Sequence, residues 1–392
     1  MEKNNPLDIK IMVVDDEVDL EPLIRQKFRK QIREKHYDFI FASNGLEALA
    51  RLIDHPKIGI IISDINMPEM DGLTLLMKLK ELKNPSLKTV IISAYGDMDN
   101  IRTAMNRGAF DFLTKPINFE DLEITINKTL EEIAQVRRSL EEHDQLLSIQ
   151  HDLQVAREIQ QAILPKAFPA FPNRTDFDVF GEMTAAKEVG GDFYDFFMID
   201  NDRLGMVIGD VSGKGIPAAI FMAVSRTLIR ATGLKGIPVD ECISYANKLL
   251  CGESTSGMFV TVFYGILNLK NGAFEYVNAG HNPPYHLTDN GISRLKSTGG
   301  TVLWFMDNFD FKSKSLTIKK GDKIYLFTDG ITEAFNRNNE PFGDKKLEDI
   351  LIRNKTLSMD QLIYEIDKGV QAFVAGYPQS DDITHLGVHY KG

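Results

Sequence analysis

Cysteine and long apolar runs are both scarce in this sequence. Its 392 residues include two cysteines, Cys242 and Cys251, which fit no metal-ligand spacing. We therefore expect ordinary half-buried thiols in a reducing compartment rather than a disulfide. Met1–Lys10 is polar and has no apolar signal core, and no apolar run approaches the length of a membrane span. These absences predict a cytoplasmic chain that does not enter a membrane.

Positive charge is also in deficit. The formal net charge is −11, and no basic stripe reverses this balance locally. An acidic surface disfavours nonspecific binding to nucleic acid or to an anionic membrane. No helix-turn-helix pattern is evident, so DNA binding ranks well below the functions considered below.

The length indicates more than one domain, and the first is expected over residues 1–118. Apolar β-branched runs alternate there with segments of helical period, which favours a parallel sheet covered by helices on both faces. The expected strands are Ile11–Val14, Phe39–Ala42, Ile58–Ile62, Val90–Ile92 and Phe110–Thr114. We predict an α/β doubly wound domain with a five-stranded parallel sheet.

Residues 119–165 are predicted to form a helical linker. The stretch contains no glycine, and its only proline is Pro165, which ends the helix. One apolar stripe runs from Ile126 to Leu147, and a second, shifted stripe runs from Leu146 to Ile163. Such a phase shift is typical of a coiled coil with a stutter, and it predicts a homodimer. The alternative is a single amphipathic helix lying along its own domain.

Residues 166–392 show a different pattern of expected secondary structure, with short strands, polar turns and helices inserted in blocks. This pattern predicts an α+β sandwich of two mostly antiparallel sheets flanked by helices. The expected strands are Leu204–Gly209, Val260–Leu269, Ala273–Asn278, Lys323–Phe327 and Ile383–His389. The expected helices are Pro217–Ala231, Val239–Leu250 and Met359–Val374.

Unusual polar residues stand at the strand ends of the first domain, namely Asp15, Asp16, Asp64, Ser93 and Lys115. The carboxyl ends of parallel strands share one rim, so these side chains should meet. Clustered carboxylates favour a hard cation such as Mg²⁺, beside which an aspartate can accept a phosphoryl group. Helix capping would explain one such aspartate but not the whole set.

This first domain resembles the receiver domain of bacterial response regulators in four segments: Lys10–Glu17 (KIMVVDDE), Ser63–Gly72 (SDINMPEMDG), Ile91–Ala94 (IISA) and Phe112–Pro116 (FLTKP). The resemblance implies that Asp64 is the phospho-acceptor and that Asp15 and Asp16 help it to hold Mg²⁺. It also implies a sensor histidine kinase as the phosphodonor.

The same resemblance assigns the switch residues of the receiver. Ser93 is the hydroxyl switch residue, Lys115 contacts the phosphoryl group, and Phe112 occupies the aromatic switch position, where tyrosine is common. The bond between Lys115 and Pro116 is expected to be cis.

The C-terminal part contains four acidic motifs: Gly190–Asp195 (GGDFYD), Gly209–Gly215 (GDVSGKG), Phe327–Glu333 (FTDGITE) and Ser380–Thr384 (SDDIT). Aspartates from separate strand ends can hold two divalent metals about 3.5–4 Å apart, which activate a shared water and clamp a phosphoryl group. The sequence has no Ser/His/Asp signature and no Cys-x5-Arg loop, in agreement with chemistry that needs no covalent nucleophile. A turn would explain Asp329–Gly330 alone, but not four motifs beside apolar strands.

In this order the motifs resemble the PPM-type metal-dependent protein phosphatases. The nearest branch contains the stage II sporulation phosphatase and the phosphatases that regulate stress sigma factors. The resemblance implies that Asp192, Asp210, Asp329 and Asp381 bind two Mn²⁺ or Mg²⁺ ions and form the catalytic set. It further implies that Asp210 bridges the metals and that the carbonyl of Val211 completes one metal shell.

Four smaller signals leave alternatives open. Asp382 could exchange roles with Asp381, and Lys187 could either meet substrate phosphate or be a solvated lysine. His281 could donate a proton, although structural packing is the favoured interpretation. The segment Val302–Met306 (VLWFM) departs from the family's glycine-containing turn. The aromatic residues around the first acidic motif are expected in the core: Phe193, Tyr194, Phe196 and Phe197.

Together these features predict a response regulator in which phosphorylation of Asp64 controls a protein serine/threonine phosphatase. By resemblance, the typical substrate is a phosphorylated anti-sigma-factor antagonist of the STAS type. The alternative is a non-catalytic adaptor that binds a partner protein when the receiver is phosphorylated. The cognate kinase, the substrate and the sign of regulation cannot be derived from the sequence.

Overall fold

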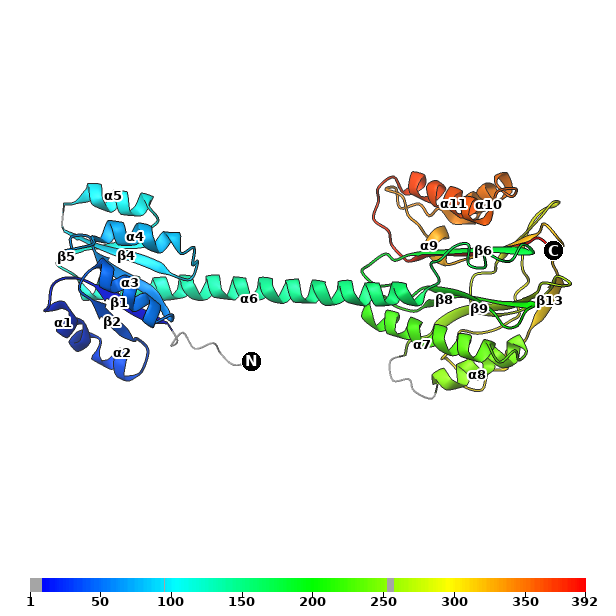
Figure 1. Cartoon of the computed structure of the whole chain (residues 1–392), viewed down its shortest axis with the longest axis horizontal. Helices are drawn as coiled ribbons and strands as arrows, with labels where there is room; N and C mark the ends of the chain where they lie inside the picture. Colours follow the sequence, from blue (N-terminus) through cyan, green and yellow to red (C-terminus); the bar gives the residue numbers. More distant parts are fainter. Residues whose placement is uncertain (1–8, 95, 252–256) are drawn as a thin grey trace. The chain divides into compact units, whose positions relative to one another are not determined.

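The computed structural model describes residues 9–94, 96–251 and 257–392, and it divides the chain into two compact units, 1–149 and 150–392 (Figure 1). Part of the polar N-terminal stretch Met1–Lys10 therefore lies outside the described residues. Among the helices that the structure describes, none combines the length and the apolar character needed to cross a bilayer.

Within the described residues, the N-terminal unit contains a five-stranded parallel sheet in the order β2-β1-β3-β4-β5. The strands are β1 (Lys10–Val14), β2 (Phe39–Ala42), β3 (Ile58–Asp64), β4 (Lys88–Ala94) and β5 (Asp111–Lys115). Five helices join them: α1 (Leu20–Lys27), α2 (Arg29–Arg33), α3 (Gly45–Asp54), α4 (Gly72–Glu81) and α5 (Met98–Asn106). The predicted doubly wound fold is confirmed.

Alternate residues of β1 face two different cores. Ile11 and Val13 pack with Ile24 of α1 and with Ile126 of the next helix, α6 (Phe119–Ile163). Met12, on the opposite face, packs in a cluster with α3 and α4. This period-two alternation buries both faces of the sheet, so the open rim at the strand ends is left for polar chemistry.

Helix α6 spans 45 residues and ends two residues before Pro165, as predicted. Its first turns bury Leu122, Ile126 and Ile133 in the N-terminal unit. Farther along, Leu146 and Ile149 are exposed. The seam predicted for a coiled coil is thus uncovered along the middle of the helix, and the coiled coil itself stays a prediction.

Two antiparallel sheets form the layers of the second unit, with helices outside both (Figure 1). One sheet has the order β13-β10-β9-β8-β7 and the other β12-β11-β14-β15-β6. The strands are β6 (Phe177–Thr184), β7 (Phe193–Met198), β8 (Arg203–Val211), β9 (Val260–Asn268), β10 (Ala273–Ala279), β11 (Tyr285–Thr288), β12 (Gly291–Arg294), β13 (Lys314–Thr317), β14 (Lys323–Phe327) and β15 (Ile383–Tyr390). The predicted sandwich of mostly antiparallel sheets is confirmed.

The helices of this unit lie on opposite outer faces of the sandwich (Figure 1). They are α7 (Ile216–Gly233) and α8 (Val239–Cys251) on one side, with α9 (Asp329–Thr332), α10 (Gly343–Arg353) and α11 (Met359–Val374) on the other. The three helices expected here from the sequence are confirmed within two residues at each end. The main core lies between the sheets and under α7 and α8, and it includes the predicted aromatic residues of β7.

Candidate functional sites

Three carboxylates meet at the rim of the N-terminal sheet. Asp15 and Asp16 follow β1, and Asp64 ends β3, so the neighbouring strands β1 and β3 bring them together. One oxygen from each lies within 4.8 Å of the others. Three oxygen ligands at this spacing fit a hard divalent cation, which keeps water in its remaining positions.

Lys115 neutralises part of this charge. Its Nζ lies 2.7 Å from Asp64, 2.8 Å from Glu17 and 3.2 Å from Asp15. Burial opposes the charged form of Lys115, but hydrogen bonds to Asp64 and Glu17 outweigh it and raise the pKa of the lysine. Burial raises the pKa of Asp15, against the opposing hydrogen bond from Glu17 and the charge of Lys115.

Glu17 belongs to this group although it was absent from the predicted site. The signal for it was present, since Glu17 follows Asp15 and Asp16 in the motif KIMVVDDE. The backbone N–H of Glu17 donates to Asp15 Oδ1 at 2.8 Å, which places its side chain beside Lys115.

The predicted switch residues lie on β4 and β5. Ser93 is fully buried, and its hydroxyl lies 3.5 Å from Asp97 Oδ2. Phe112 is 39% exposed, and the Lys115–Pro116 bond is cis. The two side chains therefore occupy different environments, one inside the rim and one at the surface of the unit.

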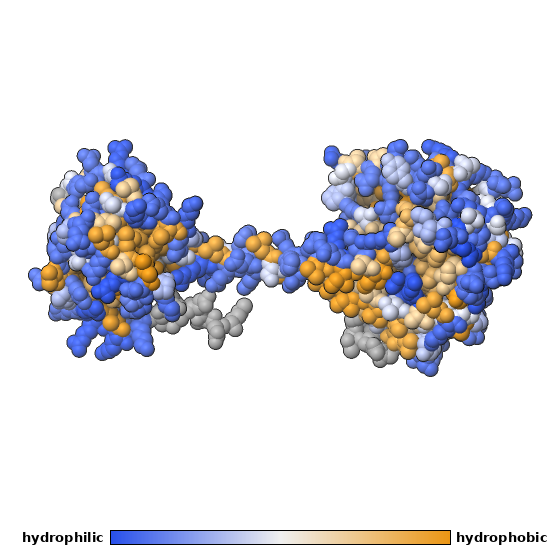
Figure 2. Space-filling model, in the orientation of Figure 1, coloured by the Kyte–Doolittle hydropathy of each residue, from blue (hydrophilic) through white to orange (hydrophobic). Residues whose placement is uncertain are grey.

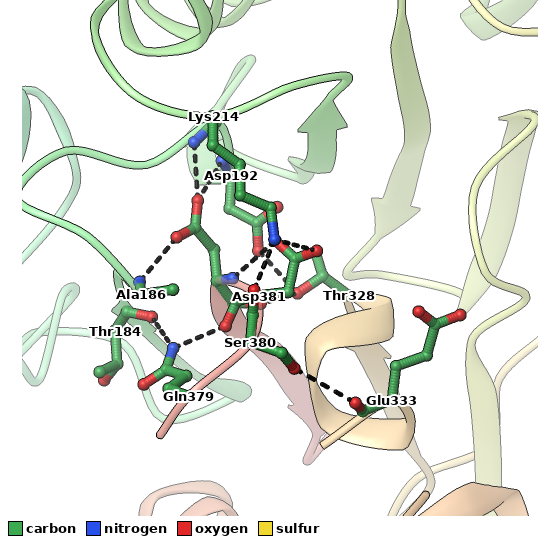
Figure 3. A network of polar contacts seen from close by, with 11 residues as sticks. Thr184, Ala186, Asp192, Lys214, Thr328, Glu333, Gln379, Ser380 and Asp381 are labelled. Atoms are coloured by element: carbon green, nitrogen blue, oxygen red, sulfur yellow. Dashed lines mark hydrogen bonds and ion pairs between the residues drawn. The ribbon is translucent and has the colours of Figure 1, made fainter. Parts of the chain in front are cut away.

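In the second unit, four predicted aspartates come from four separate segments. Asp192 precedes β7, Asp210 lies in β8, Asp329 begins α9 and Asp381 precedes β15. The charges of Asp329 and Asp381 act on the carboxyl of Asp210, and Asp192 and Asp210 lie close enough to affect each other's pKa. The sandwich therefore gathers residues that are up to 189 positions apart in sequence around one acidic centre. Figure 3 shows two of them, Asp192 and Asp381.

Two hydroxyl groups orient Asp192. Thr328 Oγ1 and Thr384 Oγ1 each donate to Asp192 Oδ2 at 2.7 Å. The two threonines are fully buried and lie beside each other, since the backbone N–H of Thr384 donates to Thr328 Oγ1 at 3.0 Å. One oxygen of Asp192 is thus held by two hydroxyl groups, and the nearby charge of Asp210 acts on the same carboxyl.

Burial and like charge both favour protons on these carboxyl groups. Burial, followed by the nearby charge of Asp210, raises the pKa of Asp192 well above its usual range. Burial and then Asp329 raise the pKa of Asp210 to about 7. A buried excess of carboxylates is the donor set expected for hard divalent metals, so the residues present fit the two implied ions.

The neighbours Asp381 and Asp382 have distinct roles in the geometry. Asp382 accepts backbone N–H groups of Ala186 at 2.8 Å and of Gly191 at 2.7 Å. Asp381 instead forms an ion pair of 2.9 Å with Lys214 (Figure 3). Asp382 therefore braces the loop that carries Asp192, whereas Asp381 is paired with a lysine side chain.

Two tight backbone approaches require glycine near the acidic centre. A Cβ on Gly191 would lie 2.8 Å from the carbonyl oxygen of Val211, and a Cβ on Gly330 would overlap the carbonyl oxygen of Asp382. These glycines let three loops meet closely enough for their aspartates to share one centre. They also place the Val211 carbonyl beside the Asp192 loop, where it could complete a metal shell.

The three ligand atoms that lie within 4.8 Å of one another, in the part of the chain described, belong to Asp15, Asp16 and Asp64. Among the described residues, no three of the four aspartates of the second unit reach that spacing. Lys214 forms an ion pair with Asp381 there, whereas Lys115 pairs with Asp15, Glu17 and Asp64 in the first unit.

His281 contacts a hydroxyl group and a backbone carbonyl, and Lys187 lies at the surface. His281 is buried, with Nδ1 2.9 Å from Thr261 Oγ1 and Nε2 3.1 Å from the carbonyl of Phe327. Burial lowers the pKa of His281 to about 4, so the ring is neutral and ties β9 to β14. Lys187 is exposed on the loop between β6 and β7.

Helix α6 reaches the acidic centre through one side chain that sequence reasoning missed. Gln160 is buried, and its Nε2 donates to the carbonyl of Gly190 at 2.6 Å while its Oε1 accepts the N–H of Gly190 at 3.0 Å. Gly190 stands two residues before Asp192. The buried amide was hidden in the sequence because glutamine in a helix is ordinarily a surface residue.

Comparisons with known proteins agree with this division. Residues 11–127 match the family described as response regulator receiver domain, and residues 200–391 match the family described as stage II sporulation protein E (SpoIIE). The first range contains every predicted receiver residue. The second contains Asp210, Asp329 and Asp381, whereas Asp192 precedes it.

Among curated relatives, Protein IcfG of Synechocystis is 33% identical over 266 residues, which cover 61% of this chain and 41% of that protein. Phosphoserine phosphatase RsbU of Bacillus subtilis is 29% identical over 225 residues, covering 56% of this chain and 66% of that protein. The chain thus spans less than two thirds of the length of these relatives. The SiaA-PP2C domain of Pseudomonas aeruginosa, with a TM-score of 0.56 and 19% identity, covers 62% of this chain and 98% of its own, and it shows the same fold.

Proposed function

We propose that this chain joins a response regulator receiver domain to a phosphatase domain of the SpoIIE and PP2C type, and that the receiver controls hydrolysis of phosphoserine or phosphothreonine in a partner protein. The convergence of Asp192, Asp210, Asp329 and Asp381 on one centre carries the proposal. When bound there, two Mn²⁺ or Mg²⁺ ions would lower the pKa of a water and neutralise phosphoryl oxygens.

The chain's own residues prepare that centre. Thr328 and Thr384 fix the rotamer of Asp192. Asp382 accepts the Gly191 N–H and so restrains the loop between β6 and β7. Preorganised ligands avoid the cost of ordering at the moment of reaction. Asp210, whose carboxyl is affected by Asp192, Asp329 and Asp381, would hold both ions in this proposal.

The test of catalysis is hydrolysis of an aryl phosphate with and without Mn²⁺. We expect metal-dependent turnover in the wild-type chain and its loss in Asp210→Asn. An adaptor without catalytic activity would show no Mn²⁺-dependent turnover and would bind its partner equally well after Asp210→Asn.

We further propose that Asp64 is the phospho-acceptor, with Asp15 and Asp16 holding Mg²⁺ and Lys115 contacting the phosphoryl group. A sensor histidine kinase is the expected donor. Incubation with a small phosphodonor should label the chain and change its phosphatase turnover. A response that persists unchanged in Asp64→Asn would refute control by the receiver.

The proposed route of control runs through α6. Gln160 forms hydrogen bonds with both the N–H and the carbonyl of Gly190. A rotation or shift of the helix would therefore move the loop that carries Asp192. A stuttered coiled coil offers two registers of similar energy, and a modest coupling free energy then selects between them. Phosphorylation would act by changing the preferred register.

We propose that the chain works as a homodimer. The end of α6 and the start of α7 expose a continuous apolar face in the second unit (Figure 2), in which Ile159, Ile216 and Ile220 are all at least half exposed. Together with the exposed seam of α6, this face is suited to a second copy of the chain.

For the substrate, we propose a serine-phosphorylated anti-sigma-factor antagonist of the STAS type in the cytoplasm. Support comes from similarity to RsbU, which is described as a phosphoserine phosphatase. Capture of phosphoproteins on the Asp210→Asn variant is the direct test. Recovery of phosphoproteins without any STAS domain would reject this substrate class and leave the catalytic proposal intact.

A further inference from the structure

Lys214 is a cation that the structure places against the acidic centre. Its Nζ forms the ion pair with Asp381 Oδ2 at 2.9 Å and donates to the carbonyl of Ser380 (Figure 3). Its charge also acts on Asp329, where it opposes the effect of burial on the carboxyl pKa. Lys214 therefore compensates two of the four aspartates.

The residues on both sides of Lys214 are glycines with a positive φ. Gly213 and Gly215 have φ values of +90° and +83°, and a Cβ at either position would meet no atom within 4 Å. Glycine populates such conformations without steric cost, and neither residue is packed. A small backbone rotation could carry the lysine away from Asp381 without disturbing a core.

The position of this loop links it to two other elements. It directly follows Asp210 and Val211 at the end of β8, and it directly precedes α7. Ser212, in the same loop, is held to Phe259, which directly precedes β9, since its backbone N–H donates to the carbonyl of Phe259 and its hydroxyl accepts the Phe259 N–H. Beyond Ser212, the loop is tied to the acidic centre by the side chain of Lys214.

We propose that Lys214 is an internal counter-ion that competes with the divalent metal for Asp381. The inference rests on the part of the proposed function that makes Asp381 a metal ligand. While the ammonium pairs with Asp381, that carboxylate is not free to ligate, and the four aspartates do not close to ligand spacing. Metal binding then requires Lys214 to swing out on its two glycines.

The experiment measures Mn²⁺ binding directly, from the electron paramagnetic resonance signal of free Mn²⁺ over the full-length chain. We expect Lys214→Met to bind Mn²⁺ about two- to fivefold more tightly than wild type, because a half-exposed ion pair is screened by water. Lys214→Arg should retain the competition and stay within twofold of wild type.

Lys187→Met is the matched control. It removes the same charge from an exposed lysine on the neighbouring loop without removing an ion pair to Asp381, so a general electrostatic effect would appear in both methionine variants. Equal tightening in Lys187→Met and Lys214→Met would overturn the inference, as would unchanged or weaker binding in Lys214→Met.

A double variant assigns the effect to the ion pair. In the Asp381→Asn background, Lys214→Met should no longer tighten Mn²⁺ binding, because the carboxylate for which Lys214 and the metal compete has been removed. Binding is read without turnover, so failure of the two proposals can be told apart. A chain that binds Mn²⁺ in the expected order but hydrolyses no phosphate ester would refute the phosphatase function and support the role of Lys214.

Discussion

One oxygen of Asp192 accepts hydrogen bonds from two threonine hydroxyls. We therefore predict that these hydroxyls contribute to metal affinity. Thr328→Val or Thr384→Val removes one of the donors at 2.7 Å while keeping the side-chain shape. We expect Mn²⁺ binding to weaken about tenfold or more in each variant, because residues that orient metal ligands typically contribute at that level. Titration of free Mn²⁺ measures the effect.

Thr227→Val is the appropriate control for this pair. Its hydroxyl donates to the carbonyl of Ala223 within α7, away from the acidic centre. Wild-type Mn²⁺ affinity in Thr328→Val and Thr384→Val would show that Asp192 needs no such support.

Burial of neutral His281 predicts a pH dependence of stability. Because burial lowers its pKa to about 4 while the unfolded chain keeps the ordinary value near 6.5, the unfolded state binds more protons between these limits. Stability is therefore complete above about pH 6.5 and falls as the pH drops toward 4, by up to about 3 kcal/mol. Calorimetric melting of the second unit at several pH values measures this loss.

His281→Gln separates the structural role of this residue from a catalytic one. The variant should be less stable at pH 7, by about 1–3 kcal/mol for its disturbed buried hydrogen bonds, and its stability should fall less steeply in acid. A variant with wild-type melting at every pH but no turnover would instead identify His281 as a proton donor.

Sequence reasoning located the individual acidic residues well and their partners poorly. The aspartate motifs stood out because several charged residues beside apolar strands require a common cause. The choice between Asp381 and Asp382 could not be made, since it depends on which side chain faces the Gly191 N–H in three dimensions. Lys214 and Gln160 were missed for the same reason.

At the scale of elements, Gln160 joins α6 to Gly190. We predict that Gln160→Leu will uncouple α6 from the loop that carries Asp192. The substitution leaves the N–H and carbonyl of Gly190 without their partners in a buried position, which costs about 1–3 kcal/mol of stability. We also expect the change in turnover on phosphodonor treatment to diminish. Melting temperature and the ratio of turnover with and without phosphodonor are the measurements.

Gln161→Leu is the control for that variant, because Gln161 is the adjacent residue of α6 and contacts Lys166 near the surface. It should leave stability within about 0.5 kcal/mol of wild type. A full phosphodonor response in Gln160→Leu would show that the signal takes another path.

The elements themselves were predicted unevenly, for physical reasons. Helices α7, α8 and α11 have clear apolar periodicity, and their bounds were close to those observed. The short edge strands β12 and β13 were missed, since few of their residues are buried and no alternation results. Strand β7 was recognised as core but not as a strand, because five of its six residues are buried and hide the period of two.

For the whole molecule, the exposed face of α6 and α7 predicts self-association. Ile220 is 60% exposed in that face, and Ile220→Glu should shift the chain toward monomer in sedimentation, because a charge in an apolar interface must be desolvated. The control is Tyr364→Glu, since Tyr364 is 65% exposed on α11, on the opposite outer face of the sandwich. Equal sedimentation of both variants and wild type would contradict the proposed dimer interface.

The raised pKa of Asp210 has a consequence for calorimetry. Burial and then the charge of Asp329 raise this pKa to about 7, so part of the Asp210 carboxyl population holds a proton near neutral pH, and arriving cations should displace it. Fewer protons should be released as the pH rises above 7, where Asp210 is already ionised. The heat of metal loading will then include the ionisation enthalpy of the buffer, so phosphate and Tris solutions should yield different apparent enthalpies for the same reaction.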